Sequence, residues 1–324
     1  MNTNNPVNQR NQQPQRREVD RFELVVERTH EKMKALAETV ESISPHHPFG
    51  HRVFAHMVAL HCEAPQLVNS ENISHEHAKL VTTTLAIHDI GRLVCQIQKP
   101  GDREFQHQHG EIGAQYLREN SLLRGLSEEE VDVVLKAVEF HGVKTVNLPE
   151  DSLAFQICSL VRDLDRFTLL DSNENFMSPR GILHQVSMWM LGETDKKALE
   201  SLSSDERHEL NTKIQQLINE GINPSVTPDA LTASVFKHMT RKIPEDQIAK
   251  VLRGELLTKE DSIYGYPSYM LSHLAQLNDI KSLPVLRKIA QTAVLETRFK
   301  YLENVAPDLR DTLAILRAKL RNFT

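Results

Sequence analysis

The chain has 324 residues, of which 25% are charged and 5% are aromatic, and its formal net charge is −6. This length allows a substantial hydrophobic core and lies between the sizes typical of one domain and of two. The negative net charge argues against nucleic acid or an anionic membrane as a partner, although a local basic pocket can still bind a phosphate. No apolar run is long enough to span a bilayer, and the first residues lack the pattern of a secretory signal.

The composition predicts an all-α fold. Only 12 residues are glycine, and long stretches are rich in Leu, Ala, Glu, Lys and Gln, which favour helices. The three cysteines, Cys62, Cys95 and Cys158, are widely spaced among apolar residues. That pattern is typical of reduced thiols in a core rather than of a disulfide framework, so we expect a cytoplasmic protein.

The amino-terminal segments predict a tail followed by two helices. Residues 1–18 are mostly Asn, Gln, Pro and Arg, so we expect a disordered polar tail. Apolar residues then recur at helical intervals from Val19 to about Ser44, which predicts an amphipathic helix. A second helix is predicted to begin at His51. The helix face that carries His51 would also carry Ala55, Val58, Ala59 and Cys62, and this apolar stripe predicts that His51 is buried.

Two further segments carry metal-binding residue types. Ser74 is a predicted N-cap for a helix that runs into His88-Asp89, with Gly91 loosening the backbone just after the pair. His109 opens the next predicted helix, and Gly113 lies one turn further along the same face. A small residue in that place leaves room beside the imidazole for a bulkier group.

The next two predicted helices also end in polar residues that suit a site. Residues 127–130 have the pattern of a capping box, and the apolar face that follows them continues to His141. Gly142 is a natural cap for the end of that helix. A last apolar stripe over residues 157–164 leads directly to Asp165.

Beyond about Asp171 the pattern stays helical but shows no cluster with an evident chemistry. We expect this region to be a helical extension that packs on the first half, covers a site or forms a homodimer contact. Its predicted helices lie near residues 180–191, 196–220, 228–241, 244–257, 268–278, 281–303 and 308–322.

Five separate segments therefore carry a metal-binding residue type on a predicted buried face. Each gap between them is about one helix and one loop long, so a helical bundle can bring them to one pocket. Four imidazoles and two carboxylates are enough for two divalent ions, and mixed nitrogen and oxygen ligation suits Fe, Mn, Ni, Co or Zn better than Ca. The residues are His51, His88, Asp89, His109, His141 and Asp165.

At these positions the chain resembles the HD superfamily of metal-dependent phosphohydrolases. The superfamily signature is an early His, a His-Asp pair and a late Asp, which His51, His88-Asp89 and Asp165 match. The resemblance covers roughly residues 25–170. It implies an HD-type helical bundle over residues 19–170, with residues 171–324 as an extension of unknown role.

The resemblance also implies a ligand set and a reaction. His109 and His141 match the positions that supply a second metal in the binuclear members, and Arg92 follows His-Asp-x-Gly as a basic residue often does there. Asp89 would bridge two ions, Fe and Mn being the first candidates and Ni, Co, Zn and Mg the others. The implied activity is hydrolysis of a nucleotide or another small phosphate mono- or diester by a metal-bound hydroxide, with Arg92 balancing the phosphate charge.

Several alternatives stay open at this point. A sensor or scaffold could keep the same pocket to bind a nucleotide without hydrolysing it, and a nuclease is a weaker hypothesis because the sequence lacks a basic stripe. Asp163 competes with Asp165 for the late ligand position, although the family pattern favours the residue directly before Arg166. The tripeptide Gly265-Tyr266-Pro267 matches a signature of the cyclic-di-GMP-hydrolysing branch, but it follows Asp165 instead of preceding it, so we interpret it as a turn.

Overall fold

The computed structural model describes residues 20–43, 49–68, 73–143, 146–171, 242–257 and 266–323. Within these ranges the chain forms helices and no β-strand, which confirms the predicted all-α fold. The predicted tail and the helices predicted near 180–191, 196–220 and 228–241 lie outside the described residues.

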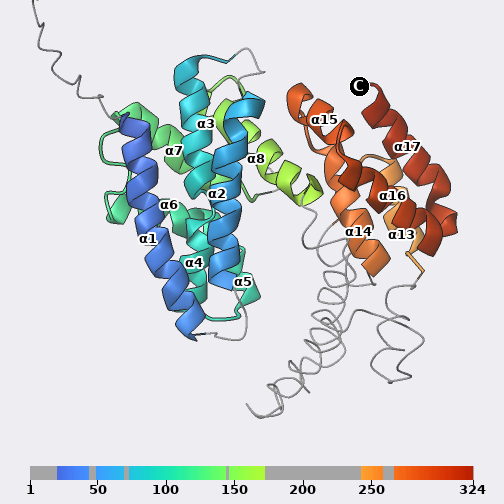
Figure 1. Cartoon of the computed structure of the whole chain (residues 1–324), viewed down its shortest axis with the longest axis horizontal. Coiled ribbons are helices and arrows are strands. Elements are labelled where there is room, and N and C mark those ends of the chain that lie inside the picture. The colour runs from blue at the N-terminus through green and yellow to red at the C-terminus, as the bar shows by residue number, and fades with distance from the viewer. Residues whose placement is uncertain are drawn as a thin grey trace, which may run out of the picture.

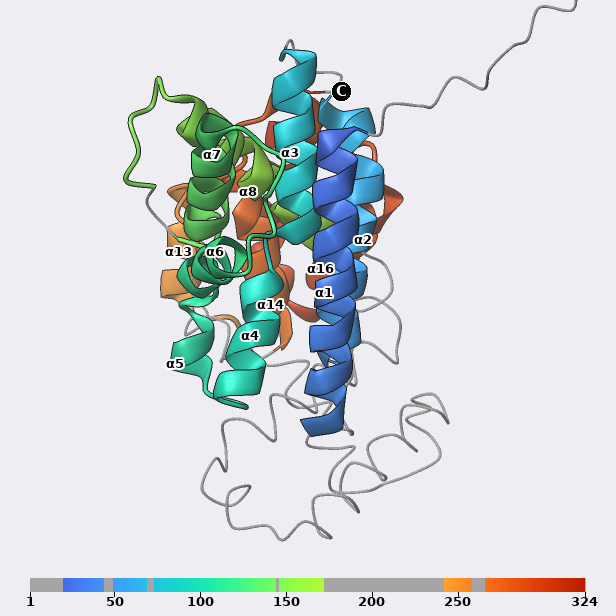
Figure 2. The same cartoon turned by 90° about the vertical axis from the view of Figure 1, so that its left-hand side faces the viewer.

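The helices form two lobes that α8 connects (Figure 1). In the first lobe, α1 and α2 pack side by side with α3, while α4, α6 and α7 follow on the other side (Figure 2). Its elements are α1 (Arg21–Ile43), α2 (Phe49–Val68), α3 (His75–Ile87), α4 (Ile90–Gln98), α5 (Arg103–Gln106), α6 (His109–Glu119), α7 (Glu128–Phe140) and α8 (Leu153–Asp171).

Local sequence signals set several of these boundaries. The Ser74 side chain accepts a hydrogen bond from the backbone N–H of His77 and so caps α3 as predicted. The predicted capping box is also present, because Ser127 and Glu130 each accept from the other's backbone N–H at the start of α7. Both caps satisfy backbone donors that no helical carbonyl can reach.

The predicted buried face of α2 is wrong. His51, Ala55, Ala59 and Cys62 are not buried, and Val58 is half-buried. The helix instead buries a stripe of larger side chains at the same periodicity, which removes more apolar surface from water. That buried stripe is Val53, Met57, Leu60, Ala64 and Leu67. The prediction of a core thiol therefore fails for Cys62, whereas Cys95 and Cys158 are buried.

A close crossing of α4 and α6 depends on glycine. A Cβ atom on Gly91 would lie 1.8 Å from the carbonyl oxygen of His109 and 2.7 Å from the backbone nitrogen of Gly113. Only a residue without a side chain fits there. Because Asp89 lies just before Gly91, this crossing brings the His-Asp pair and His109 together.

The second lobe is a smaller set of helices that packs on the first. Among the described residues it contains α13 (Glu245–Leu252), α14 (Tyr266–Ala275), η2 (Gln276–Asn278), α15 (Leu283–Ala290), α16 (Ala293–Val305), η3 (Pro307–Leu309) and α17 (Arg310–Arg321). Helices α14, α15 and α16 contact α8, and α15 also contacts α2. The expected extension therefore does pack on the first half.

Two predictions for this lobe need correction. The single helix predicted over residues 281–303 is divided at Gln291 and Thr292 into α15 and α16. The turn predicted at Gly265-Tyr266-Pro267 is wrong for its last two residues, which begin α14, where proline is tolerated because its missing N–H needs no partner. Gly265 lies outside the described residues. None of the helices in the described ranges combines the length and apolarity needed to cross a membrane.

Candidate metal centre

The His-Asp pair lies at a break between two helices. His88 caps the end of α3, and Asp89, with φ −95° and ψ 12°, precedes the first residue of α4. In an unbroken helix the two adjacent side chains would point about 100° apart. The break lets both side chains face one centre, and both are buried at 0% and 5% relative exposure.

One group of side chains gathers around the Oδ1 atom of Asp89. The Nε2 atoms of His141 and His109 lie 3.2 and 3.3 Å from this oxygen, and they lie 3.0 Å from each other. His109 comes from the start of α6 and His141 from the end of α7. Ligand atoms about 2.1 Å from a common ion lie about 3.0–3.5 Å apart, so these separations suit one metal.

The three buried histidines of the cluster, His88, His109 and His141, are oriented by the same backbone contact. In each, Nδ1 lies within hydrogen-bonding distance of the carbonyl oxygen three residues earlier, at 2.9 Å for His88, 2.8 Å for His109 and 2.6 Å for His141. A carbonyl accepts a hydrogen bond, so Nδ1 carries the proton and the Nε2 of a neutral ring presents a lone pair. This is how metal-binding histidines are commonly held.

A second group forms around Asp165 on α8. The Oδ1 atom of Asp165 lies 3.0 Å from His56 Nε2 and 3.5 Å from His88 Nε2. His88 Nε2 is also 3.7 Å from Oδ2 of Asp89, so His88 joins the two groups. This nitrogen is buried and makes no well-formed hydrogen bond in the described part of the chain, which suits an atom that binds a metal.

Arg92 and Gln106 form the wall next to the Asp89 group. Arg92 Nε donates to Asp89 Oδ1 at 2.7 Å, and the Arg92 side chain remains 34% exposed. Gln106 donates from Nε2 to the backbone carbonyl of Arg92, while its own backbone carbonyl holds His109. Gln106 therefore ties Arg92 to His109, a role that no sequence pattern indicated.

The carboxylates of the cluster are held in their ionised form. Burial alone would raise the pKa of Asp89, but the Arg92 charge and then His88 outweigh it and hold this pKa well below its usual range. Burial likewise opposes ionisation of Asp165, but the neighbouring His56 and His88 hold its pKa well below the usual range. With the histidines neutral, two carboxylates against one guanidinium leave a net negative charge, which favours a bound cation.

The surrounding charges and burial shift the pKa values of the His88 and His109 imidazoles in opposite directions. Burial lowers the pKa of His88, but Asp89 and Asp165 more than compensate and raise it to about 9. A position that favours a proton so strongly also favours a metal cation in its place. Burial and the Arg92 charge lower the pKa of His109 to about 3, so this ring is neutral at pH 7 and its Nε2 is an acceptor.

The structure brings together every predicted site residue except His51. His51 is exposed, and its backbone N–H donates to a carboxylate oxygen of Glu41. His56, five residues later on α2, takes the place that we expected His51 to occupy. A signal for His56 was present, because it lies next to Met57 on the buried stripe of large side chains. His56 and Asp165 form the more open side, with side chains 26% and 22% exposed.

Asp163 is not part of this cluster, in agreement with the preference for Asp165. It is buried on another face of α8, and its Oδ2 atom accepts from the backbone N–H groups of Lys281 and Ser282 at 3.0 and 2.7 Å. Burial raises the pKa of Asp163 to about 6, although these two hydrogen bonds oppose the shift.

The cluster can hold a metal ion. Two sets of side chains bring their ligand atoms within 4.8 Å of one another inside each set. One set is His56, His88 and Asp165, and the other is His88, Asp89 and His141. Comparison with known protein families, with curated proteins and with solved structures finds no match for this chain.

Proposed function

We propose that this protein is a metal-dependent phosphohydrolase whose centre holds two divalent ions. One ion would be bound by His56, His88 and Asp165. The other would be bound by His109 and His141, with the Asp89 carboxylate shared between the two. Mixed imidazole and carboxylate ligation suits Mn, Fe, Co, Ni or Zn.

The observation that carries the proposal is the meeting of acceptors at Asp89. His109 and His141 each face a backbone carbonyl through Nδ1, and their Nε2 atoms lie 3.0 Å apart, so neutral rings would turn two lone pairs toward each other. The negative Oδ1 atom of Asp89 lies 3.2–3.3 Å from both. Three acceptors at these distances repel one another, and a shared cation removes that repulsion.

The choice of phosphate esters rests on three features. Divalent ions at such a centre would lower the pKa of water and polarise a phosphoryl oxygen. Arg92 is partly exposed beside Asp89, where its guanidinium can balance the charge of a bound phosphate. The motif that these residues form also resembles the HD superfamily, although His56 replaces His51 as the early histidine. We propose a nucleotide or another small phosphate mono- or diester as substrate.

Turnover with a general substrate tests the proposal. The protein loaded with Mn²⁺ should hydrolyse p-nitrophenyl phosphate or bis(p-nitrophenyl) phosphate, and a nucleotide panel would then identify the preferred ester. Asp89→Asn keeps the shape of the side chain but removes its charge, so it should abolish turnover. His75→Ala, at an exposed histidine of α3, is the matched control and should not change it.

The result that contradicts this function is a folded, metal-loaded protein that hydrolyses none of these esters. It would favour a sensor or scaffold that binds a nucleotide without cleaving it. Binding to single- or double-stranded oligonucleotides at low salt would instead favour a nuclease.

A further inference from the structure

The two sides of α8 make different contacts. Asp165 faces the metal-binding cluster through His56 and His88. Asp163, two residues earlier and about 160° around the helix, faces the second lobe. There it accepts from the backbone N–H groups of Lys281 and Ser282, and Ser282 caps α15. One turn of α8 therefore connects a candidate metal ligand with the second lobe.

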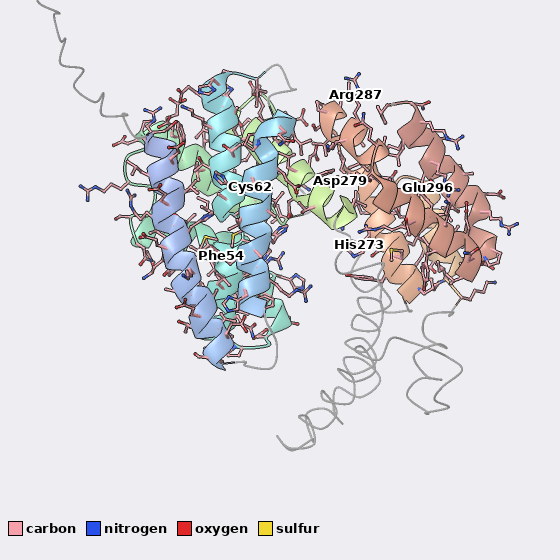
Figure 3. The ribbon with its side chains drawn as sticks, in the orientation of Figure 1. Phe54, Cys62, His273, Asp279, Arg287 and Glu296 are labelled. Carbon is pink, nitrogen blue, oxygen red and sulfur yellow. The ribbon has the colours of Figure 1, made fainter. Side chains whose placement is uncertain are left out.

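An ion-pair cluster strengthens this connection. The Oδ2 atom of Asp279 lies 2.5 Å from Arg166 Nη2 and 3.5 Å from Arg162 Nη2. Figure 3 places Asp279 between α8 and the helices of the second lobe. The arginine side chains are only 12–14% exposed, so water screens these pairs less than it screens surface pairs.

A buried aromatic side chain lies in the same part of the helix, which also contacts α14, α15 and α16. Phe167, two residues after Asp165, is 1% exposed. It lines a cleft together with Leu67 from α2 and Pro284 from α15. The stretch of α8 that carries Asp165 is thus held by the second lobe through Arg162, Asp163 and Arg166.

We propose that the second lobe is a support for one half of the metal centre, with Asp279 as a positioning residue that acts through α8 on Asp165. The inference rests on the proposed metal centre and adds a means of regulation to it. Any event that loosens the second lobe would move Asp165 and weaken the ion bound by His56, His88 and Asp165. The ion bound by His109 and His141 would be affected little, because α6 and α7 carry these ligands.

Metal titration of Asp279 variants tests this coupling. Free Mn²⁺ measured by electron paramagnetic resonance gives two stepwise dissociation constants for the apo protein. Asp279→Lys places a third cation beside Arg162 and Arg166. The dissociation constant of the ion bound through Asp165 should rise about tenfold or more, while that of the other ion changes little. Asp279→Asn should raise the same dissociation constant by a smaller factor. Asp279→Glu, which keeps the carboxylate, should leave this constant close to its wild-type value. Asp308→Lys, at an exposed aspartate in η3, is the control.

A second measurement keeps the test valid without metal. Amide hydrogen exchange in the apo protein should become faster over residues 162–170 in Asp279→Lys, with α6 and α7 unchanged. Unchanged constants in Asp279→Lys would overturn the coupling but leave the metal centre standing. An equal rise in both constants would show a general structural role instead. A wild-type protein that binds no metal would overturn the proposed centre itself.

Discussion

At the scale of single residues, the structure replaces one histidine of the predicted ligand set with another. His56 Nε2 lies 3.0 Å from Asp165 Oδ1, whereas His51 is exposed and contacts Glu41 through its backbone. The two histidines lie five residues apart on α2, which turns their side chains to different faces. This difference decides which of them can bind an ion.

We therefore predict that His56→Ala weakens metal binding and His51→Ala does not. Loss of a direct ligand should raise the dissociation constant of one ion about tenfold or more and reduce turnover in parallel. Isothermal titration of both variants with Mn²⁺ would measure this. Equal effects of the two changes, or a larger effect of His51→Ala, would contradict the assignment.

The sequence predicted most of the cluster because its members are chemically distinctive and, apart from Asp165 within α8, occur at helix ends. His88, Asp89, His109, His141 and Asp165 all follow or precede a recognisable apolar stripe. The predicted burial of His51 is wrong because α2 carries two apolar stripes of the same periodicity, and the helix buries the stripe with the larger side chains. Gln106 acts through its backbone carbonyl as well as its amide, and a backbone contact leaves no trace in residue type.

At the scale of helices, the centre depends on how closely α4 and α6 approach. At Gly91 on α4, the backbone of His109 and Gly113 lies too close to leave space for a side chain. The sequence suggested only that Gly91 loosens the chain after Asp89. The contact across the two helices joins residues far apart in the chain, so periodicity along one helix could not predict it.

Gly91→Ala should therefore disrupt the metal centre, although Gly91 itself is not a predicted ligand. A methyl group 1.8 Å from the carbonyl oxygen of His109 forces the helices apart, and such overpacking typically lowers the free energy of unfolding by about 1–3 kcal/mol. Because Asp89 and His109 move apart with the helices, metal affinity should fall as well. Urea denaturation and metal titration would measure the two effects.

Gly101→Asn is the matched control for this prediction. Gly101 has φ +75°, and a Cβ atom added to it would meet no other atom within 4 Å. Asparagine tolerates that backbone conformation better than most residues. The control should keep both stability and metal affinity close to wild type. A Gly91→Ala protein with unchanged metal affinity would show that the close crossing does not position the ligands.

At the scale of the whole molecule, the second lobe contains a buried histidine that makes stability depend on pH. His273 on α14, labelled in Figure 3, is 8% exposed and stacks edge-to-face with Tyr269. Burial, together with the Arg298 charge, lowers its pKa to about 3. The folded protein therefore holds His273 neutral at pH values where the unfolded chain binds a proton.

The sign of the effect follows from this difference. Below an unfolded pKa of about 6.5 the unfolded state takes up more protons, so the free energy of unfolding falls as pH falls. As the pH falls from 7 to 5, protonation of His273 in the unfolded chain should lower the free energy of unfolding by roughly 2 kcal/mol. Urea denaturation at both pH values should show a smaller pH effect in His273→Gln than in wild type. The exposed control His75→Gln should behave like wild type, and an equal pH effect in all three would contradict the prediction.

If one cluster binds two ions that share Asp89, the metal content per chain must reveal both. Protein prepared under reducing, metal-replete conditions and analysed by inductively coupled plasma mass spectrometry should contain about two divalent ions per chain. His141→Ala should retain about one, because the ligands His56, His88 and Asp165 remain. A wild-type protein with no more than one ion per chain, or a His141→Ala protein with unchanged metal content, would contradict the account.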